Sequence, residues 1–117
     1  MRPKTIFCDI DGTLLFHHGD LYKQMTEEPV LLNNVKEKLV EWDSKGYNII
    51  LVTGRRESCR VQTEQQLRKA GIFYDQLIMG LGGGSRVLIN DLKPYSDNPT
   101  ATAVTIKRNE GIKNVEI

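Results

Sequence analysis

The chain has 117 residues, of which 16 are Lys or Arg and 15 are Asp or Glu, so its formal net charge is only +1. This length is typical of one domain with one core, and residues 1–117 are interpreted as a single domain. The charge balance excludes an attraction of the whole chain to nucleic acid or to an acidic membrane, but it does not exclude a local basic patch. Two cysteines are too few for a disulfide framework or a zinc cluster. With no signal segment and no membrane-spanning run, we expect a cytoplasmic protein that does not contact membranes.

The first half of the chain predicts two strands and one helix. Residues 4–10 (KTIFCDI) are mostly apolar or β-prone, which favours a buried strand. Residues 16–29 are polar and irregular and indicate a loop. Residues 30–45 place apolar side chains at spacings of three and four, the period of an amphipathic helix, and Gly46 follows as a stop. Residues 47–54 (YNIILVTG) are a continuous apolar run, typical of a strand buried in a parallel sheet.

The second half predicts one more helix and three more strands. Residues 57–70 form the helix, residues 74–79 a short strand, and residues 80–85 (GLGGGS) a glycine-rich connection. Residues 86–91 (RVLIND) and 100–106 (TATAVTI) are read as the last two strands. Strands followed by helices give the βαβ pattern, so we predict an α/β fold, a three-layer Rossmann-like parallel sheet with flanking helices.

Polar side chains follow three of the predicted strands, at the point where each strand ends. The first strand ends in Asp9 and Asp11, the second in Thr53, and the fourth in Asn90 and Asp91. Ligands of open parallel sheets bind outside the carboxyl ends of the strands, so these groups are expected to meet at one edge.

The spacing of the first two acids indicates metal chemistry. Residues i and i+2 of an extended chain point the same way, so Asp9 and Asp11 can face one cavity, and Gly12 lets the chain turn away. Carboxylates that converge repel one another, and one tends to take a proton. A hard cation with oxygen ligands relieves this repulsion, and Mg²⁺ is the usual partner where phosphate oxygens complete its shell. A surface turn is the plain alternative.

Three motifs resemble those of the haloacid dehalogenase (HAD) superfamily. DIDGT (9–13) is similar to its first motif, IILVTGR (49–55) to its second, and VLIND (87–91) to its fourth. The match covers most of the chain in the family's order. The gaps between the motifs leave no room for the cap domain that many members carry, so the resemblance implies a small, capless phosphatase.

The resemblance implies a role for each acid. Asp9 is expected to attack phosphorus and form an aspartyl-phosphate, and Asp11 to act as the general acid and base. Mg²⁺ is expected as the cofactor, with Asp9, the main-chain carbonyl of Asp11, and Asp91 as its protein ligands. The protein is thus expected to be an enzyme, a Mg²⁺-dependent phosphomonoester hydrolase.

The same likeness implies a phosphate-binding set. The stretch TGRRES (53–58) resembles the corresponding stretch of polynucleotide-end phosphatases of the superfamily. Thr53, Gly54 and Arg55 are therefore expected to bind the phosphoryl group. The third motif of the superfamily supplies a cationic side chain, usually Lys. Arg86 is the first candidate for this role in the chain, and Lys69 and Lys93 are alternatives. His17 and His18 lie in the loop that forms a flap over the site in this superfamily, and their role is open.

The sequence leaves alternatives for both the substrate and the class of function. The ending of the chain resembles small sugar-phosphate phosphatases, so a phosphorylated sugar or similar small molecule is the first expectation. A nucleic-acid end is the second. A catalytically weak phosphate-binding module, or a receiver that is phosphorylated once, is the alternative from another class. A homo-oligomer, in which a neighbour covers the open site, is left open.

Overall fold

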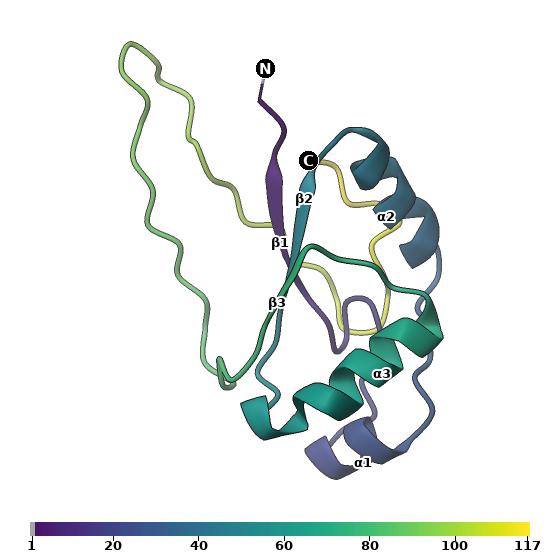
Figure 1. Cartoon of the computed structure of the whole chain (residues 1–117). Helices are drawn as coiled ribbons and strands as arrows, with labels where there is room; N and C mark the ends of the chain where they lie inside the picture. Colours follow the sequence, from purple (N-terminus) through teal and green to yellow (C-terminus); the bar gives the residue numbers. More distant parts are fainter. Residues whose placement is uncertain (1) are drawn as a thin grey trace.

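The computed structural model describes residues 2–117, and Figure 1 shows a small α/β fold with a long extended arm on one side. In chain order the elements are β1 (Thr5–Asp9), α1 (Leu21–Thr26), α2 (Val35–Ser44), β2 (Asn48–Val52), the 3-10 turn η1 (Glu57–Cys59), α3 (Arg60–Ala70) and β3 (Gln76–Ile78). The three strands form one parallel sheet in the order β1-β2-β3. The predicted α/β class, with a parallel sheet, flanking helices and no cap domain in residues 2–117, is confirmed.

The register of the sheet aligns the ends of the strands. Cys8 pairs with Leu51, and Leu51 pairs with Leu77 on the other side of β2. Because β1, β2 and β3 are neighbours in sequence order, right-handed crossovers place α2 and α3 on the same face of the sheet. That face carries the core, a cluster of buried apolar side chains to which both helices and all three strands contribute, among them Cys8, Leu39, Trp42, Ile49, Leu51, Leu67 and Leu77.

The polar segment predicted as a loop over residues 16–29 contains the short helix α1, which is a correction. Its N-cap is Asp20, whose side chain accepts a hydrogen bond from the main-chain N–H of Lys23 at 2.8 Å. Asp is among the best N-cap residues because its carboxylate satisfies one of the unpaired donors of the first turn. The sequence carried this signal, but six residues are too few to show a helical period.

The helix predicted from residue 30 begins five residues later, at Val35. Asn34, which precedes it, has a φ of 62°, in the left-handed region that Asn tolerates better than most residues. The apolar side chains Val30 and Leu32 therefore belong to the entry loop rather than to α2. The remaining boundaries agree with the prediction within a few residues, which is the usual margin for helix and strand ends.

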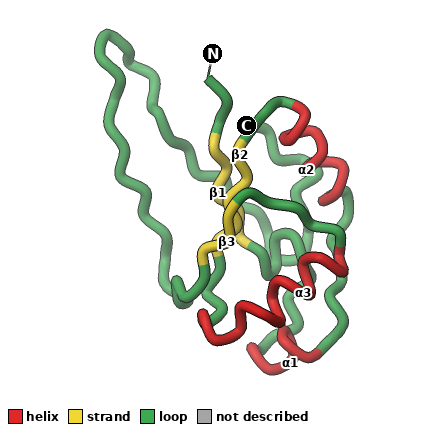
Figure 2. The backbone as a smooth tube through the Cα atoms, viewed as in Figure 1, coloured by secondary structure: helices red, strands yellow, loops and turns green. Residues whose placement is uncertain are grey.

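The strands predicted over residues 86–91 and 100–106 are absent, and both segments belong to the arm drawn as loop in Figure 2. β1 pairs with β2 alone within residues 2–117, so the arm does not extend the sheet. Most of its apolar side chains are exposed, with Val87 at 83% and Ile89 at 90% of full exposure. An apolar, β-prone run forms a strand only where a neighbouring edge accepts its hydrogen bonds, and the pattern by itself does not supply that edge.

The end of the chain returns to the body of the protein. Ile112 is 2% exposed and joins the core, and Gly111 packs so closely against the main chain of Asn33 that a Cβ there would lie 2.9 Å from the Asn33 carbonyl oxygen. Gly111 also has a φ of 83°, which favours glycine. The C-terminal segment is thereby anchored beside the loop that precedes α2. No helix in residues 2–117 has the length and apolar content that crossing a bilayer requires.

Candidate active site

A cavity of about 400 Å³ opens beyond the carboxyl ends of β1 and β2. Its lining residues come from four parts of the chain: the ends of the two strands, the loop after β1 with α1, the loop after β3, and the C-terminal segment. They include Asp9, Asp11, His17, Gln24, Thr53, Gly54, Arg55, Arg56, Arg86 and Arg108. The predicted meeting of strand-end side chains therefore holds for the first two strands, as the rule for open parallel sheets requires.

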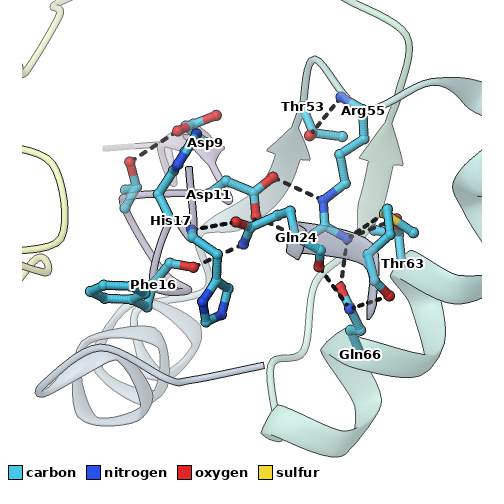
Figure 3. Close-up of polar contacts among 12 residues, drawn as sticks. Asp9, Asp11, Phe16, His17, Gln24, Thr53, Arg55, Thr63 and Gln66 are labelled. Carbon is cyan, nitrogen blue, oxygen red and sulfur yellow. Dashed lines mark hydrogen bonds and ion pairs between the residues drawn. The ribbon is translucent and has the colours of Figure 1, made fainter. Parts of the chain in front are cut away.

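Asp9 is the last residue of β1 and faces this cavity (Figure 3). Its Oδ2 accepts a hydrogen bond from the Thr13 hydroxyl at 3.2 Å. Desolvation is the largest influence and raises the pKa of Asp9 above its ordinary 3.8, and the charge of Asp11 raises it further. The hydrogen bonds from Thr13 and the Ile10 main chain, and the charge of Arg86, lower it. Desolvation and the charge of Asp11 therefore both disfavour the ionised form of Asp9, and a nearby positive charge favours it.

Asp11 is held by an arginine two residues beyond β2. The guanidinium of Arg55 donates from Nε to Asp11 Oδ2 at 2.8 Å and from Nη2 to Oδ1 at 2.7 Å. Gln24 Nε2 donates to the same Oδ1 at 2.7 Å. The Asp11 carboxylate therefore has a fixed orientation, and its Oδ2, which accepts one of these bonds, retains a lone pair that can carry a proton.

The guanidinium of Arg55 is also held by hydrogen bonds to side chains of α3, as Figure 3 shows. Its side chain is only 2% exposed, and Nη1 donates to Thr63 Oγ1 at 3.0 Å and to Gln66 Oε1 at 2.6 Å, both on α3. Gln66 Nε2 in turn donates to the main-chain carbonyl of Gln24 at 3.0 Å. Helices α1 and α3 thus share one buried polar network whose members satisfy one another, which fixes the geometry of Arg55 and Asp11.

This arrangement changes what Arg55 can do. The sequence predicts that its planar fork binds phosphate, and in the structure the fork grips Asp11 instead. Arg55 still lines the cavity. Sequence reasoning placed Arg55 at the site but missed Gln24, Thr63 and Gln66, because no spacing rule links a glutamine in a polar loop to a helix 40 residues later.

Thr53 and Gly54 follow β2 directly. Thr53 is 1% exposed, and its Oγ1 accepts the main-chain N–H of Arg55 at 3.1 Å, which leaves the hydroxyl proton for another acceptor. Gly54 lies against the loop after β3: a Cβ at Gly54 would be 2.5 Å from the carbonyl oxygen of Gly82. Both residues line the cavity, as the sequence predicts.

The three candidates for the cationic side chain of the third motif lie in different parts of the structure. Arg86 lines the cavity at the base of the arm, where its guanidinium donates to the carbonyls of Gly84 and Gly82 at 2.7 and 3.1 Å. Lys69 pairs with Glu28 at 2.7 Å on the surface, away from the cavity lining. Lys93 lies in the arm. Of the three, the structure brings only Arg86 to Asp9.

Asp91, the expected third metal ligand, also lies in the exposed arm, and the structure does not bring it to Asp9 and Asp11. Its main-chain carbonyl accepts the hydroxyl of Thr100, which joins the two limbs of the arm. No three His, Cys, Asp or Glu side chains gather as a metal site within residues 2–117. The physical reason is the missing fourth strand, since only pairing with the sheet would carry residue 91 to its edge.

The two adjacent histidines have different surroundings. His17 lines the cavity, and its Nδ1 accepts the main-chain N–H of Gly19 at 3.1 Å. His18 does not line it; its ring packs edge-on against Phe16, with 5.1 Å between ring centroids. The flap predicted after the first motif is thus a loop in which one histidine faces the cavity.

Arg108 is a cavity residue that sequence reasoning did not single out. It lies in the C-terminal segment, and the next residue, Asn109, ties that segment to the loop after β1: its main-chain N–H donates to Gly12 O at 2.8 Å, and its Oδ1 accepts the N–H of His17 at 2.7 Å. Nothing in the sequence relates residues 108 and 12, which are far apart along the chain.

The carboxylates present fit a hard cation in part. The two aspartates offer oxygen donors, and Asp9 is a carboxylate whose pKa is raised by desolvation and by Asp11, a state that a bound cation relieves. Mg²⁺ commonly takes one or two protein carboxylates and completes its shell with water and phosphate oxygens. Asp9, with the main-chain carbonyl of Asp11, is thus a sufficient protein contribution.

A parallel sheet, paired aspartates after its first strand and a threonine after its second define a phosphatase domain of the HAD superfamily. The chain belongs to the family described as the polynucleotide kinase PNKP phosphatase domain, whose match covers residues 3–86. The HAD resemblance predicted from the sequence is thereby confirmed.

The chain is also similar to two solved structures and to one curated relative. A chain of the Pnkp1/Rnl/Hen1 complex is 36% identical, with a TM-score of 0.59, over 73% of this chain and 30% of that one. A target protein from Vibrio cholerae, 21% identical with a TM-score of 0.53, shares the fold over 78% of this chain and 84% of its own. An uncharacterized protein of Methanocaldococcus jannaschii is 40% identical over 58 residues, half of this chain and 59% of that protein. The chain thus spans less than two thirds of the first and the last of these.

Proposed function

We propose that this domain removes a terminal phosphate from a polynucleotide by way of an aspartyl-phosphate on Asp9. The observation that carries the proposal is the convergence of Asp9, Asp11 and Thr53 in one cavity at the ends of β1 and β2. The family match to a polynucleotide kinase phosphatase domain supports the substrate class. The absence of a cap domain in residues 2–117 leaves the cavity open to a polymer end.

The reaction has two steps. An oxygen of the Asp9 carboxylate attacks phosphorus, the ester P–O bond breaks, and the leaving oxygen takes a proton from Asp11. Asp11 then removes a proton from a water molecule, which attacks phosphorus, breaks the bond to Asp9 and releases inorganic phosphate. Asp11 enters the cycle as a carboxylic acid and regains its proton from water, and Asp9 enters and leaves as a carboxylate, so the cycle is balanced.

The other cavity residues support these steps. Arg55 is a positioning residue, because it holds Asp11 and is held by α3. Thr53 and the main chain at Gly54 bind the phosphoryl oxygens, and Arg86 lowers the cost of ionising Asp9. Asp9 and the main-chain carbonyl of Asp11 would hold Mg²⁺, which would supply charge that offsets the repulsion between Asp9 and an anionic substrate. A contribution from Asp91 stays a prediction of the sequence, and the Mg²⁺ concentration for half-maximal rate in Asp91→Asn tests it.

The test is a phosphate-release assay with and without Mg²⁺, on oligonucleotides phosphorylated at either end, a hexose phosphate and an aryl phosphate. We expect kcat/KM on one oligonucleotide end to exceed that on the hexose phosphate by at least about tenfold, or roughly 1.4 kcal/mol. Asp9→Asn and Asp11→Asn should each lower the rate by about 10² or more. Asp43→Asn, on the exposed surface of α2, is the matched control and should change nothing.

Each part of the proposal can fail by itself. A higher kcat/KM on the hexose phosphate would reject the polynucleotide and support the sugar-phosphate alternative predicted from the sequence. An unchanged rate in Asp9→Asn would reject the nucleophile. Release of about one phosphate per chain, without turnover, would indicate the receiver-like alternative.

A further inference from the structure

The C-terminal segment contributes an arginine that the proposed reaction does not use. Three arginines other than Arg55 line the cavity: Arg56 after β2, Arg86 at the base of the arm, and Arg108. Arg86 lies close enough to Asp9 to lower its pKa and donates to two loop carbonyls. Arg108 forms no ion pair with any residue of the described chain, 2–117. Its charge is therefore available to a ligand.

The position of Arg108 is built into the fold. Asn109 adopts a φ of 68° and exchanges hydrogen bonds with the loop after β1, to Gly12 O at 2.8 Å and from the N–H of His17 at 2.7 Å. Ile112, 2% exposed, anchors the same segment in the core. A left-handed φ is unfavourable for a residue other than glycine, and these contacts offset that cost.

The Arg108 side chain runs directly over Gly12. A Cβ at Gly12 would lie 3.1 Å from Arg108 Cγ and 3.8 Å from its Nε. Arg108 lines the same cavity as Asp9 and Asp11, so it does not lie on a remote surface. Glycine serves two purposes there, since its φ of 89° suits the turn and its missing side chain makes room for Arg108.

We propose that Arg108 binds a second phosphate group of the substrate, which in a polynucleotide is the phosphodiester next to the terminal phosphate. The inference rests on the proposed function for its substrate class. A single phosphate bound at Asp9 and Thr53 is contacted by the groups at the strand ends. Arg108 comes from the C-terminal segment, so it can contact a second phosphate. A planar guanidinium with no carboxylate partner is suited to bidentate contact with phosphate oxygens.

The test compares substrates that differ by one charge. A mononucleotide phosphorylated at the preferred end is compared with the dinucleotide and with the same dinucleotide joined by a neutral methylphosphonate. We expect wild-type kcat/KM to favour the charged dinucleotide over both others by about tenfold, the effect of one charge-assisted hydrogen bond. In Arg108→Gln this preference disappears, and Arg108→Lys restores part of it. Lys107→Gln is the control, because Lys107 is the exposed neighbour outside the cavity.

The salt dependence gives a second readout that a merely structural role would not move. The dinucleotide preference of the wild-type protein should fall as KCl is raised, and that of Arg108→Gln should not depend on salt. An equal loss of kcat/KM on all three substrates in Arg108→Gln would overturn the inference, as would a preference that survives the substitution.

Failure of the proposed function has a different signature. If the wild-type protein hydrolyses no nucleotide, the same variants are compared on a hexose bisphosphate and a hexose monophosphate. A bisphosphate preference lost in Arg108→Gln would keep Arg108 as a second-phosphate site while the polynucleotide proposal fails. Turnover of nucleotides with no dependence on Arg108 would keep the proposed function and reject this inference.

Discussion

Arg55 binds Asp11 through two hydrogen bonds, from Nε to Oδ2 at 2.8 Å and from Nη2 to Oδ1 at 2.7 Å. The two side chains are 2% and 15% exposed, so the pair is withdrawn from bulk water. A buried ion pair is held by the hydrogen bonds around it more than by its charges alone, and Gln24, Thr63 and Gln66 provide those bonds here. The position of the Asp11 side chain therefore depends on α1, on α3 and on the residues after β2.

Removing the arginine should destabilise the domain. Arg55→Gln leaves Asp11 and the two acceptor oxygens of α3, on Thr63 and Gln66, without their donor. Breaking a buried pair in this way costs about 3–5 kcal/mol. We expect the free energy of unfolding in urea to fall by about 3 kcal/mol, with Arg55→Lys intermediate because Lys cannot form the bidentate contact. Arg56→Gln, a neighbour with an exposed side chain, should stay within about 0.5 kcal/mol of wild type. Equal losses in both variants would contradict the role of the pair.

A side chain at Gly54 should disturb the loop after β3. In Gly54→Ala the new Cβ would meet the carbonyl oxygen of Gly82 at 2.5 Å, and main chain cannot rotate away as a side chain can. Overpacking of this kind costs about 1–3 kcal/mol. Because Gly82 O accepts a hydrogen bond from Arg86, kcat/KM should fall as well. Gly83→Ala is the control, since nothing lies within 4 Å of a Cβ there, and thermal unfolding with kinetics on both variants checks the prediction.

The acid side of the pH–rate profile should depend on Arg86. Asp9 attacks as a carboxylate, desolvation raises its pKa, and the charge of Arg86 lowers it. Removing that charge in Arg86→Gln should raise the pKa, so the midpoint of the acidic limb of kcat/KM moves to higher pH. Arg86→Lys should keep most of the wild-type position. Arg68→Gln, exposed on α3, provides the comparison, and an acidic limb that does not move in Arg86→Gln would contradict the prediction.

The two cysteines should differ in reactivity. Cys8 is 7% exposed in β1, and burial, aided by the charge of Asp9, raises the pKa of its thiol to about 12. Thiolates and not thiols react with disulfide reagents, so Cys8 should stay unmodified in the folded protein at pH 8. Cys59, partly exposed in η1, should react. Titration with a chromogenic disulfide should count one thiol before unfolding and two after it, and none before unfolding in Cys59→Ser.

Local patterns in the sequence were enough for the elements of the body and for part of the site. Apolar runs gave β1 and β2, the helical period gave α2 and α3, and strand-end polarity placed Asp9, Asp11 and Thr53 at one edge. These features depend on neighbouring residues and on the geometry of parallel sheets, so they can be read without coordinates.

Contacts between distant segments decided the rest. The sequence did not reveal that Arg55 grips Asp11, or that the C-terminal segment carries Arg108 over Gly12, because no local pattern encodes a contact between residues so far apart. Residues 86–91 have the composition of a strand, yet without a paired edge they form part of an exposed arm and keep Asp91 from the cavity. The polar groups at the ends of two strands can be predicted from local sequence alone. The charges that face them depend on packing, because strands and charged groups meet their partners only when the chain folds.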